Sequence, residues 1–343
     1  MNIRARQKMM SSGLIVKLRI TFIALAGVAF AAYLIWYVGF GAVFSAALTL
    51  GWTGFAILCG YALALFLVLG TAWHVLVSDS PLAGLAIFVW ARMVRDSAAE
   101  TLPFSQLGGF VIGARAAILQ GVSPPIAVAT MVADITTELM AQITFVALGI
   151  VLLTLRAPAA SATPLAGALE IGLVIAVIAG ALFFAVQRYG HRFLKIFAAR
   201  FLPRAFGQAA AVAAALETVY RAPARILLSF LLHLTAWVAS AIGTWIAFRL
   251  IGANVDLAAV VAIESVVYAI RSAAFAIPNA LGVQEAAYAL LAPMLVVGPE
   301  LGLAISLIKR ARDVAIGIPT LLVWQTLEGS RALMAGQPDQ NPL

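Results

Sequence analysis

The sequence has little charge and almost no cysteine. Of its 343 residues, 10% are charged and 64% are hydrophobic. Soluble domains carry about 25% charged residues, so this composition excludes an ordinary soluble domain and indicates an all-α polytopic membrane protein. The single cysteine, Cys59, lies in an apolar run. One cysteine excludes an intramolecular disulfide and a cysteine-based metal site.

Motifs for nucleotide hydrolysis and metal binding are also missing. The sequence has no Walker A motif and no aspartate-rich motif of the kind that binds prenyl diphosphates. Its three histidines, His74, His191 and His233, are scattered, so no zinc cluster is expected. We therefore expect no cofactor, no metal and no nucleic-acid partner, and we predict no catalytic residue.

Long apolar runs fill most of the chain. A spanning helix needs roughly 20 mostly apolar residues. The segments that meet this need are 19–39, 53–77, 124–153, 165–187, 226–249 and 301–327. Two further regions, 82–122 and 256–298, are apolar but interrupted by charge, proline and glycine. The sequence thus predicts about six full spans and two broken segments.

The distribution of lysine and arginine predicts the orientation. Five basic residues precede the first run and seven lie in 188–225, whereas 40–52 has none. Because such residues mark the cytoplasmic side, both termini and the 188–225 segment are expected inside, the latter as a basic amphipathic loop on the inner leaflet. The regions 82–122 and 256–298 then each start and end on one face, as re-entrant hairpins that enter from opposite sides.

Two stretches 175 residues apart are nearly alike. At this offset Ser97 matches Ser272, and Pro103 matches Pro278. The match predicts two repeat units, about 53–153 and 226–327, within one membrane domain over 1–328 that a polar tail, 329–343, follows. Each unit reads as span, broken hairpin and span, and the units have opposite topology. In transporters built this way, substrates bind near the midplane between the broken helices.

The two units contain fourteen ionisable residues. They are Arg92, Arg95, Asp96, Glu100, Arg115, Asp134 and Glu138 in the first, and Glu264, Arg271, Glu285, Lys309, Arg310, Arg312 and Asp313 in the second. A lone charge at the bilayer centre costs about 2.5–3.5 kcal/mol even on insertion scales. These side chains must therefore pair with one another, line a wet cavity or contact a polar ligand. Internal salt bridges that only hold the hairpins remain an alternative to a binding site.

Helical spacing places polar residues on shared faces. The stripes at these spacings are Thr130, Asp134, Glu138 and Gln142; Ser306, Arg310 and Asp313, with Gly317 beside them; and His233, Trp237, Ser240 and Thr244. Residues three or four apart lie on one side of a helix. The first two stripes are expected to flank a central cavity. The third either lines the same cavity or bonds between helices, as Ser and Thr commonly do in membranes.

Proline and glycine interrupt both hairpins. Pro103 and Pro278 free backbone groups from the helical ladder, and Gly108, Gly109 and Gly282 permit close backbone approach or positive φ. A half-helix that begins at such a point would direct its amides at an anion. The predicted substrate-binding residues are Arg95, Glu100, Pro103, Gly108, Gly109, Arg115, Asp134, Glu138, Arg271, Pro278, Gly282, Glu285, Arg310 and Asp313.

The interrupted segments carry a family resemblance. Leu102-Pro103 with Gly108-Gly109 and Arg115, and Ile277-Pro278 with Leu281-Gly282-Val283-Gln284-Glu285-Ala286-Ala287, resemble the paired signatures of the lysylphosphatidylglycerol synthase transmembrane region family. Asn279 and Ala280 stand where the family commonly has glycines. The resemblance covers about 15–327 and implies a polytopic protein tied to lipid translocation. The sequence carries no soluble aminoacyl-transferase domain, so lysyl transfer is not expected.

Three functions stay open at this point. The leading hypothesis is an inner-membrane lipid translocator, or an accessory to one, for a phospholipid or a hopanoid or isoprenoid lipid. A stand-alone chain of this kind is also similar to membrane proteins associated with hopanoid biosynthesis in Gram-negative bacteria. The alternatives are a membrane enzyme that modifies a lipid head group and a scaffold for lipid-biosynthesis enzymes. The expected partners are membrane lipids, with anionic phospholipid or hopanoid as candidates, and lipid-biosynthesis enzymes.

Overall fold

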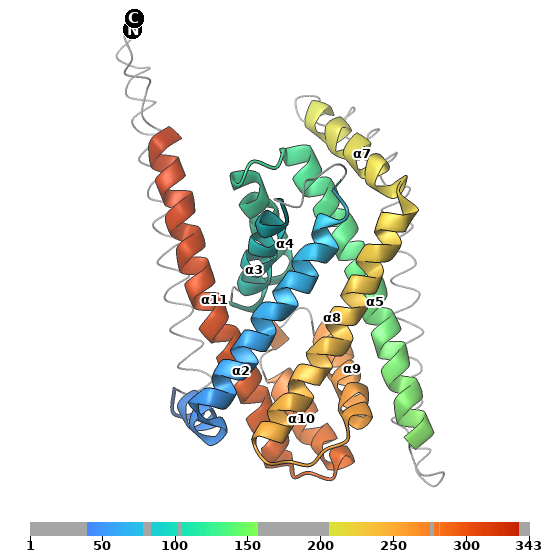
Figure 1. Cartoon of the computed structure of the whole chain (residues 1–343), viewed down its shortest axis with the longest axis vertical. Helices are drawn as coiled ribbons and strands as arrows, with labels where there is room; N and C mark the ends of the chain where they lie inside the picture. Colours follow the sequence, from blue (N-terminus) through green and yellow to red (C-terminus); the bar gives the residue numbers. More distant parts are fainter. Residues whose placement is uncertain are drawn as a thin grey trace, which may run out of the picture.

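The computed structural model describes residues 40–77, 84–101, 105–156, 206–274, 278–280 and 282–335. These form α-helices with short 3₁₀ turns and no strand, which confirms the all-α prediction for the described residues (Figure 1). The helices are α2 (Phe40–His74), α3 (Leu85–Thr101), α4 (Ser105–Leu119), α5 (Pro124–Arg156), α7 (Phe206–Tyr220), α8 (Pro223–Leu250), α9 (Leu257–Ala273), α10 (Val283–Leu291) and α11 (Pro299–Ala335). The 3₁₀ turns are η3 (Pro278–Ala280) and η4 (Ala292–Leu295).

Some predicted segments lie outside the described residues. These are the spans 19–39 and 165–187, most of the basic loop 188–225, and the last part of the tail. Among the described helices, three are long and apolar enough to cross a membrane, over Leu50–His74, Pro124–Leu153 and Pro223–Leu250. They match the predicted spans 53–77, 124–153 and 226–249. The span predicted over 301–327 forms part of α11, a 37-residue helix that carries four charged residues over 309–313. The total number of spans therefore stays a prediction.

In each unit, the long helix before the hairpin and the long helix after it run in opposite directions, and the order of the two directions is reversed between the units. In Figure 1, α2 rises and α5 descends, whereas α8 descends and α11 rises. The α3–α4 hairpin lies toward the top of the view and the α9–α10 pair toward the bottom. α5 begins at Pro124 and α11 at Pro299, which keeps the 175-residue offset, and α3 and α9 each have 17 residues. This arrangement is the one expected of an inverted repeat.

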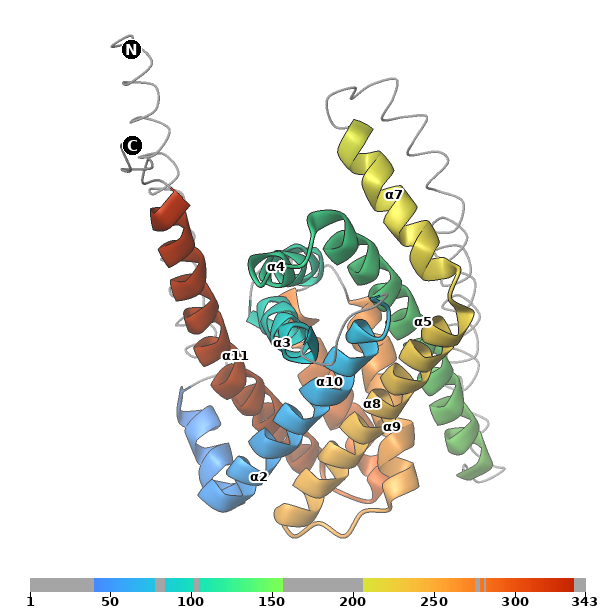
Figure 2. The same cartoon turned by 45° about the horizontal axis from the view of Figure 1, so that its top comes forward.

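Each long helix packs against the hairpin of the other unit. α5 contacts α9, and α11 contacts α3, while α2 packs along α8. Figure 2 shows α3 and α4 between α11 on one side and α5 on the other. The exchange of partners interlocks the two units, so the space between them is bounded by elements from both.

Glycine permits close helix contacts in each unit. A Cβ at Gly109 of α4 would lie 2.7 Å from the carbonyl oxygen of Arg95, and a Cβ at Gly302 of α11 would lie 2.5 Å from that of Tyr288. The expected close approach at Gly109 is therefore observed, and it draws α4 against α3. A Cβ at Gly108 would have no atom within 4 Å, so the packing does not explain why glycine stands at this position.

Apolar side chains cover the outside as well as the core. Large hydrophobic residues such as Leu63, Leu67, Leu227 and Leu231 are exposed on α2 and α8. An apolar surface of this extent is unfavourable in water and suits hydrocarbon. The exposed faces of these spans are consistent with a lipid environment.

Candidate functional site

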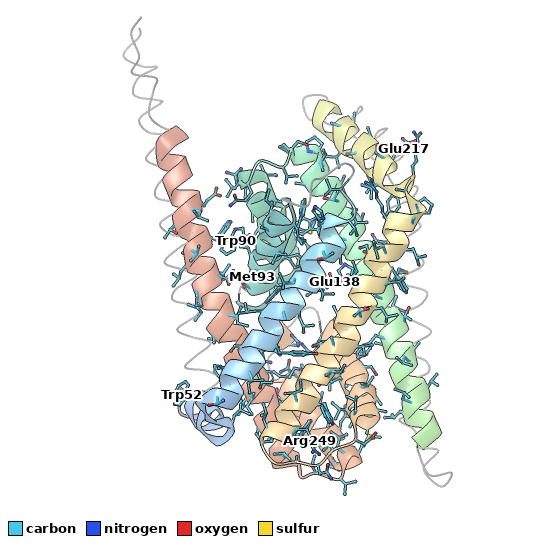
Figure 3. The ribbon with its side chains drawn as sticks, in the orientation of Figure 1. Trp52, Trp90, Met93, Glu138, Glu217 and Arg249 are labelled. Carbon is cyan, nitrogen blue, oxygen red and sulfur yellow. The ribbon has the colours of Figure 1, made fainter. Side chains whose placement is uncertain are left out.

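A cavity of about 460 Å³ lies between the two units. Its walls come from α2, α3, α4, α5, α8, α9, η3 and α11. Its charged lining residues are Arg92, Arg95, Asp96, Glu100, Glu138, Arg271, Arg312 and Asp313. Glu138 lies near mid-height of the bundle, between Arg249 at the lower end of α8 and Glu217 on α7 (Figure 3). The lining contains four arginines and four carboxylates, so it carries no large excess of either sign.

An ion cluster from α3 and α5 forms one wall of the cavity. We define it as Arg92, Arg95, Asp96, Asp134 and Glu138, and call it the α3–α5 cluster. Arg92 Nη2 lies 2.5 Å from Glu138 Oε1 and Arg92 Nε lies 2.8 Å from Asp96 Oδ2. Arg95 Nη1 lies 2.7 Å from Asp134 Oδ2, and Arg95 Nη2 also pairs with Glu138. The spacings of three and four residues direct these groups from each helix toward the other.

One side of the α3–α5 cluster is buried in the protein, and the other side borders the cavity. Asp134 is fully buried, whereas the side chains of Asp96 and Glu138 are 24% and 17% exposed. Buried charges are tolerated when they are paired and hydrogen-bonded, which both arginines satisfy here. The exposed carboxylates place the polar edge of the cluster at the cavity.

A third element closes the buried side of this cluster. His233 of α8 lies with Nε2 2.9 Å from Asp134 Oδ1. His233, Trp237 and Ser240 all line the cavity, so the third polar stripe faces it at these three positions. The fourth member, Thr244, instead accepts a hydrogen bond from Lys309 Nζ at 3.2 Å.

The broken ends of the two hairpins meet at the cavity. Arg271 Nη2 lies 3.0 Å from each carboxylate oxygen of Glu100 and 3.1 Å from Asn279 Oδ1. Asn279 Nδ2 donates to the backbone oxygen of Glu100 at 2.7 Å. We call Glu100, Arg271 and Asn279 the hairpin link, because they join residues 171 and 179 positions apart in the chain.

The second hairpin bends through left-handed backbone. Asn279 and Ala280 have φ of 49° and 46°, and Gly282 has φ of 80°. This region is costly for residues other than glycine. The two positions where the resembling family commonly has glycine are thus the two where this chain places other residues in a glycine conformation. The side chain of Asn279 offsets part of that cost through its bonds in the hairpin link.

The amide of Gly282, the residue directly before α10, is bonded to a carboxylate of that helix. Gly282 N donates to Glu285 Oε2 at 2.8 Å, and Glu285 also pairs with Arg310, whose Nη2 lies 3.1 Å from the same oxygen. One of the donors at this helix start, where an external anion was expected, is therefore already engaged. Gly282, Glu285 and Arg310 are not part of the cavity lining.

The remaining predicted residues divide between the cavity and other places. Asp313 lines the cavity and pairs with Arg312 at 2.7 Å. Arg115 is half exposed and lies 2.9 Å from Glu328 Oε1, away from the cavity. Pro278 begins η3, and Pro103 lies outside the described residues. The structure therefore brings Arg95, Glu100, Glu138, Arg271 and Asp313 together at the cavity, with Asp134 directly behind them.

Several cavity residues were not in the predicted set. Arg92, Asp96 and Arg312 belong to the fourteen ionisable residues but not to the predicted binding residues, and neither Tyr268 nor Asn279 is among them. Arg92 and Asp96 carried a signal, since they lie three residues before and one after Arg95. Tyr268 lies three residues before Arg271, on the same helical face. Its ring contacts Trp237 at 4.6 Å between centroids, and its hydroxyl lies 2.9 Å from Ser240 Oγ.

The described residues offer no metal site. Across these ranges, no three His, Cys, Asp or Glu side chains are grouped in a way that would hold a metal ion. The chemistry that the lining can perform is instead ionic pairing, hydrogen bonding and aromatic contact with a polar group that enters the cavity.

Comparison with known proteins gives one match. The family model described as the lysylphosphatidylglycerol synthase TM region matches residues 24–319. That range includes both hairpins and every cavity residue named above. No curated protein and no solved structure matches the chain.

Proposed function

Since the chain belongs to the lysylphosphatidylglycerol synthase TM region family, we propose that it moves a lipid head group between the two leaflets of a bacterial inner membrane. Membership indicates a membrane protein with a lipid-related role. The match covers the transmembrane region of the family's synthases. The proposal is transport, or assistance to transport, and the alternative is a membrane enzyme that modifies the lipid head group.

The observation that carries this proposal is the charged cavity between the two opposed units. A polar head group cannot enter hydrocarbon without losing its hydration, which is costly for any charged group. The four arginines and four carboxylates of the lining supply replacement partners for phosphate and for amine or hydroxyl groups. Apolar residues of α2 between 62 and 69 line another wall, where acyl chains have suitable surroundings.

The interlocked units suggest how the cavity changes access. Alternating access in inverted-repeat transporters arises when one unit rocks against the other around a fixed site. Here the hairpin link joins the units directly at the cavity, through Glu100, Arg271 and Asn279. We expect this link to break when the units rock. A head group whose phosphate displaced Glu100 from Arg271 would favour that step.

Reconstitution into liposomes tests the proposal. A fluorescent phospholipid in the inner leaflet becomes sensitive to an external quencher only after it has crossed the bilayer. Protein-containing vesicles should show faster crossing than empty ones, and Arg271→Gln should slow it at least about tenfold, equivalent to about 1.4 kcal/mol of barrier. Arg115→Gln is the matched control, because Arg115 is half exposed and lies outside the cavity.

Two results would count against this function. Crossing rates equal to those of empty vesicles, for phospholipid and for a hopanoid or isoprenoid lipid alike, would show that this chain alone does not transport lipid. Equal rates for Arg271→Gln and Arg115→Gln would show that the lipid does not pass through the cavity. Mass spectrometry of the extracted lipids separates transport from head-group modification, since only an enzyme would yield a lipid of new mass.

A further inference from the structure

We propose that His233 is a proton-binding site whose loading is coupled to the binding of an anionic head group in the cavity. This inference rests on the proposed function, because it names the ion that accompanies the lipid. It begins from a buried polar atom. Nδ1 of His233 is buried and has no hydrogen-bond partner among the described residues, whereas the other ring nitrogen contacts Asp134.

The partners of Asp134 determine which ring nitrogen carries hydrogen. Asp134 Oδ2 accepts from Arg92 at 3.2 Å and from Arg95 at 2.7 Å, so this side chain acts as an acceptor toward its partners. Nε2 of His233, 2.9 Å from Asp134 Oδ1, must then be the donor of that contact. Nδ1 is left with its lone pair and is the place where a second proton binds.

The surrounding charges favour a proton at this place. In the α3–α5 cluster, two guanidinium groups face three carboxylates, so one negative charge has no cationic partner within the cluster. The ionisable groups from the other elements around the cavity are Arg271 and Tyr268 of α9, Glu100 of α3, and Arg312 and Asp313 of α11. Arg271 pairs with Glu100 and Arg312 with Asp313, and the cavity-lining residues of α2 are apolar. A proton on His233 would therefore neutralise the cluster.

Protonation of His233 and binding of an anion would assist each other. An imidazolium at His233 competes with Arg92 and Arg95 for Asp134, which loosens both arginines toward the cavity. A phosphate that engages these arginines leaves Asp134 to the imidazolium. By thermodynamic linkage the effect is reciprocal, so an anionic head group must strengthen proton binding by the same factor by which the proton strengthens head-group binding.

The burial of Nδ1 links proton exchange to conformation. In this structure His233 has no exposed surface although it borders the cavity. A proton therefore reaches Nδ1 only when the wall around α8 rearranges. Restricted access of this kind is what prevents a coupled carrier from leaking protons without moving its substrate.

Histidine-selective isotope labelling tests the site directly. The chain has three histidines, so ¹⁵N spectra contain three pairs of ring-nitrogen signals, and His233→Gln identifies the pair that belongs to position 233. The protein is measured in nanodiscs of phosphatidylcholine with and without phosphatidylglycerol, between about pH 5 and pH 8, where histidine changes charge. We expect a larger protonated fraction of the His233 ring at a given pH when phosphatidylglycerol is present than when it is absent. A ring that keeps one tautomer throughout, or titrates identically in both membranes, overturns the coupling.

Transport measurements test the consequence. Crossing of phosphatidylglycerol in wild-type vesicles should fall as pH rises, approaching about tenfold per pH unit above the titration midpoint, the limit for one proton. His233→Gln keeps a donor toward Asp134 but cannot titrate, so its rate should not change with pH. His74→Gln is the control, because His74 is buried against Phe88 outside the cavity, and it should keep the wild-type profile.

The two proposals fail in different ways. If lipid crosses equally fast at every pH, or if His233→Gln keeps the pH profile, the proton site is wrong while lipid transport stands. If no lipid crosses under any condition, the proposed function fails, and the ¹⁵N titration alone still decides whether His233 binds a proton in response to the anionic lipid.

Discussion

Corresponding helices of the two units carry ion pairs of exchanged sign. Arg92 is the eighth residue of α3, and Glu264 is the eighth of α9, which places Glu264 three residues before the position that the 175-residue offset assigns to Arg92. Asp134 is the eleventh residue of α5, and Lys309 is the eleventh of α11. Arg92 Nη1 lies 3.2 Å from Asp134 Oδ2, and Lys309 Nζ lies 2.6 Å from Glu264 Oε2. The same contact joins hairpin and long helix in both units, with the cation and the anion interchanged.

The surroundings of the two pairs differ. Glu264 has no exposed surface, and Tyr288 and Thr244 complete the bonds of this second pair away from the cavity. The first pair is extended by Arg95, Asp96 and Glu138, and that extension is what reaches the cavity. The comparison teaches that a buried ion pair serves the fold in both units. The charges added around the first pair are the candidates for function.

The Glu264–Lys309 pair, which we call the closed pair because it lies away from the cavity, should be the most sensitive to removal of one partner. Lys309→Met leaves Glu264 buried without its cation, so the free energy of unfolding should fall by about 3–5 kcal/mol. Thermal unfolding in nanodiscs measures the loss. The double variant Glu264→Gln with Lys309→Met removes both charges and should recover most of it. A single variant as stable as the wild type would show that the second pair has no structural role.

Substitutions in the α3–α5 cluster should change the rate of lipid crossing more than the stability of the fold. Glu138→Gln removes a carboxylate from a cluster that has one in excess, so the fold should survive, while lipid crossing should fall about tenfold. Glu264→Gln is the same substitution in the closed pair and should lower the melting temperature instead, because it leaves Lys309 uncompensated. Liposome crossing rates and melting temperatures for both variants check this. Similar profiles for the two would remove the distinction between the pairs.

The bend of the second hairpin should give the smallest effect. Ala280 has φ of 46° and is buried, so Ala280→Gly relieves a left-handed alanine and should stabilise the protein by up to about 1 kcal/mol. Gly282→Ala is the reverse change at φ of 80°, where no atom crowds the position, and should destabilise by a similar amount. Melting temperatures that move in the same direction for both variants would contradict this account of the bend.

The sequence predicted much of the architecture because its signals are local. Apolar length gave the spans 53–77, 124–153 and 226–249, and four-residue spacing placed Asp134 and Glu138 on one face. Partners from other helices could not be read this way, since Arg271 meets Glu100 across 171 residues only after the units interlock.

Two predicted binding residues, Glu285 and Arg115, lie outside the cavity for different reasons. Glu285 looked like a ligand-binding carboxylate, yet it caps its own helix at Gly282, three residues earlier, a short-range pattern that the sequence did contain. Arg115 looked equivalent to the other buried-zone arginines, but it is half exposed and pairs with Glu328 of α11. Which face of a helix is covered depends on packing with helices far away in the chain.

The exchanged signs also bear on how the chain assembles correctly during insertion. Because each long helix also contacts the hairpin of the other unit, the two hairpins and two long helices offer a second ion pairing as well as the observed one. Had the ion pairs been identical, the hairpin of one half could satisfy its buried charge on the long helix of the other. With exchanged signs, Arg92 would meet Lys309 and Glu264 would meet Asp134, and both encounters repel. A duplicated protein can thus keep two near-copies of one motif in a single membrane and still have only one way to match them.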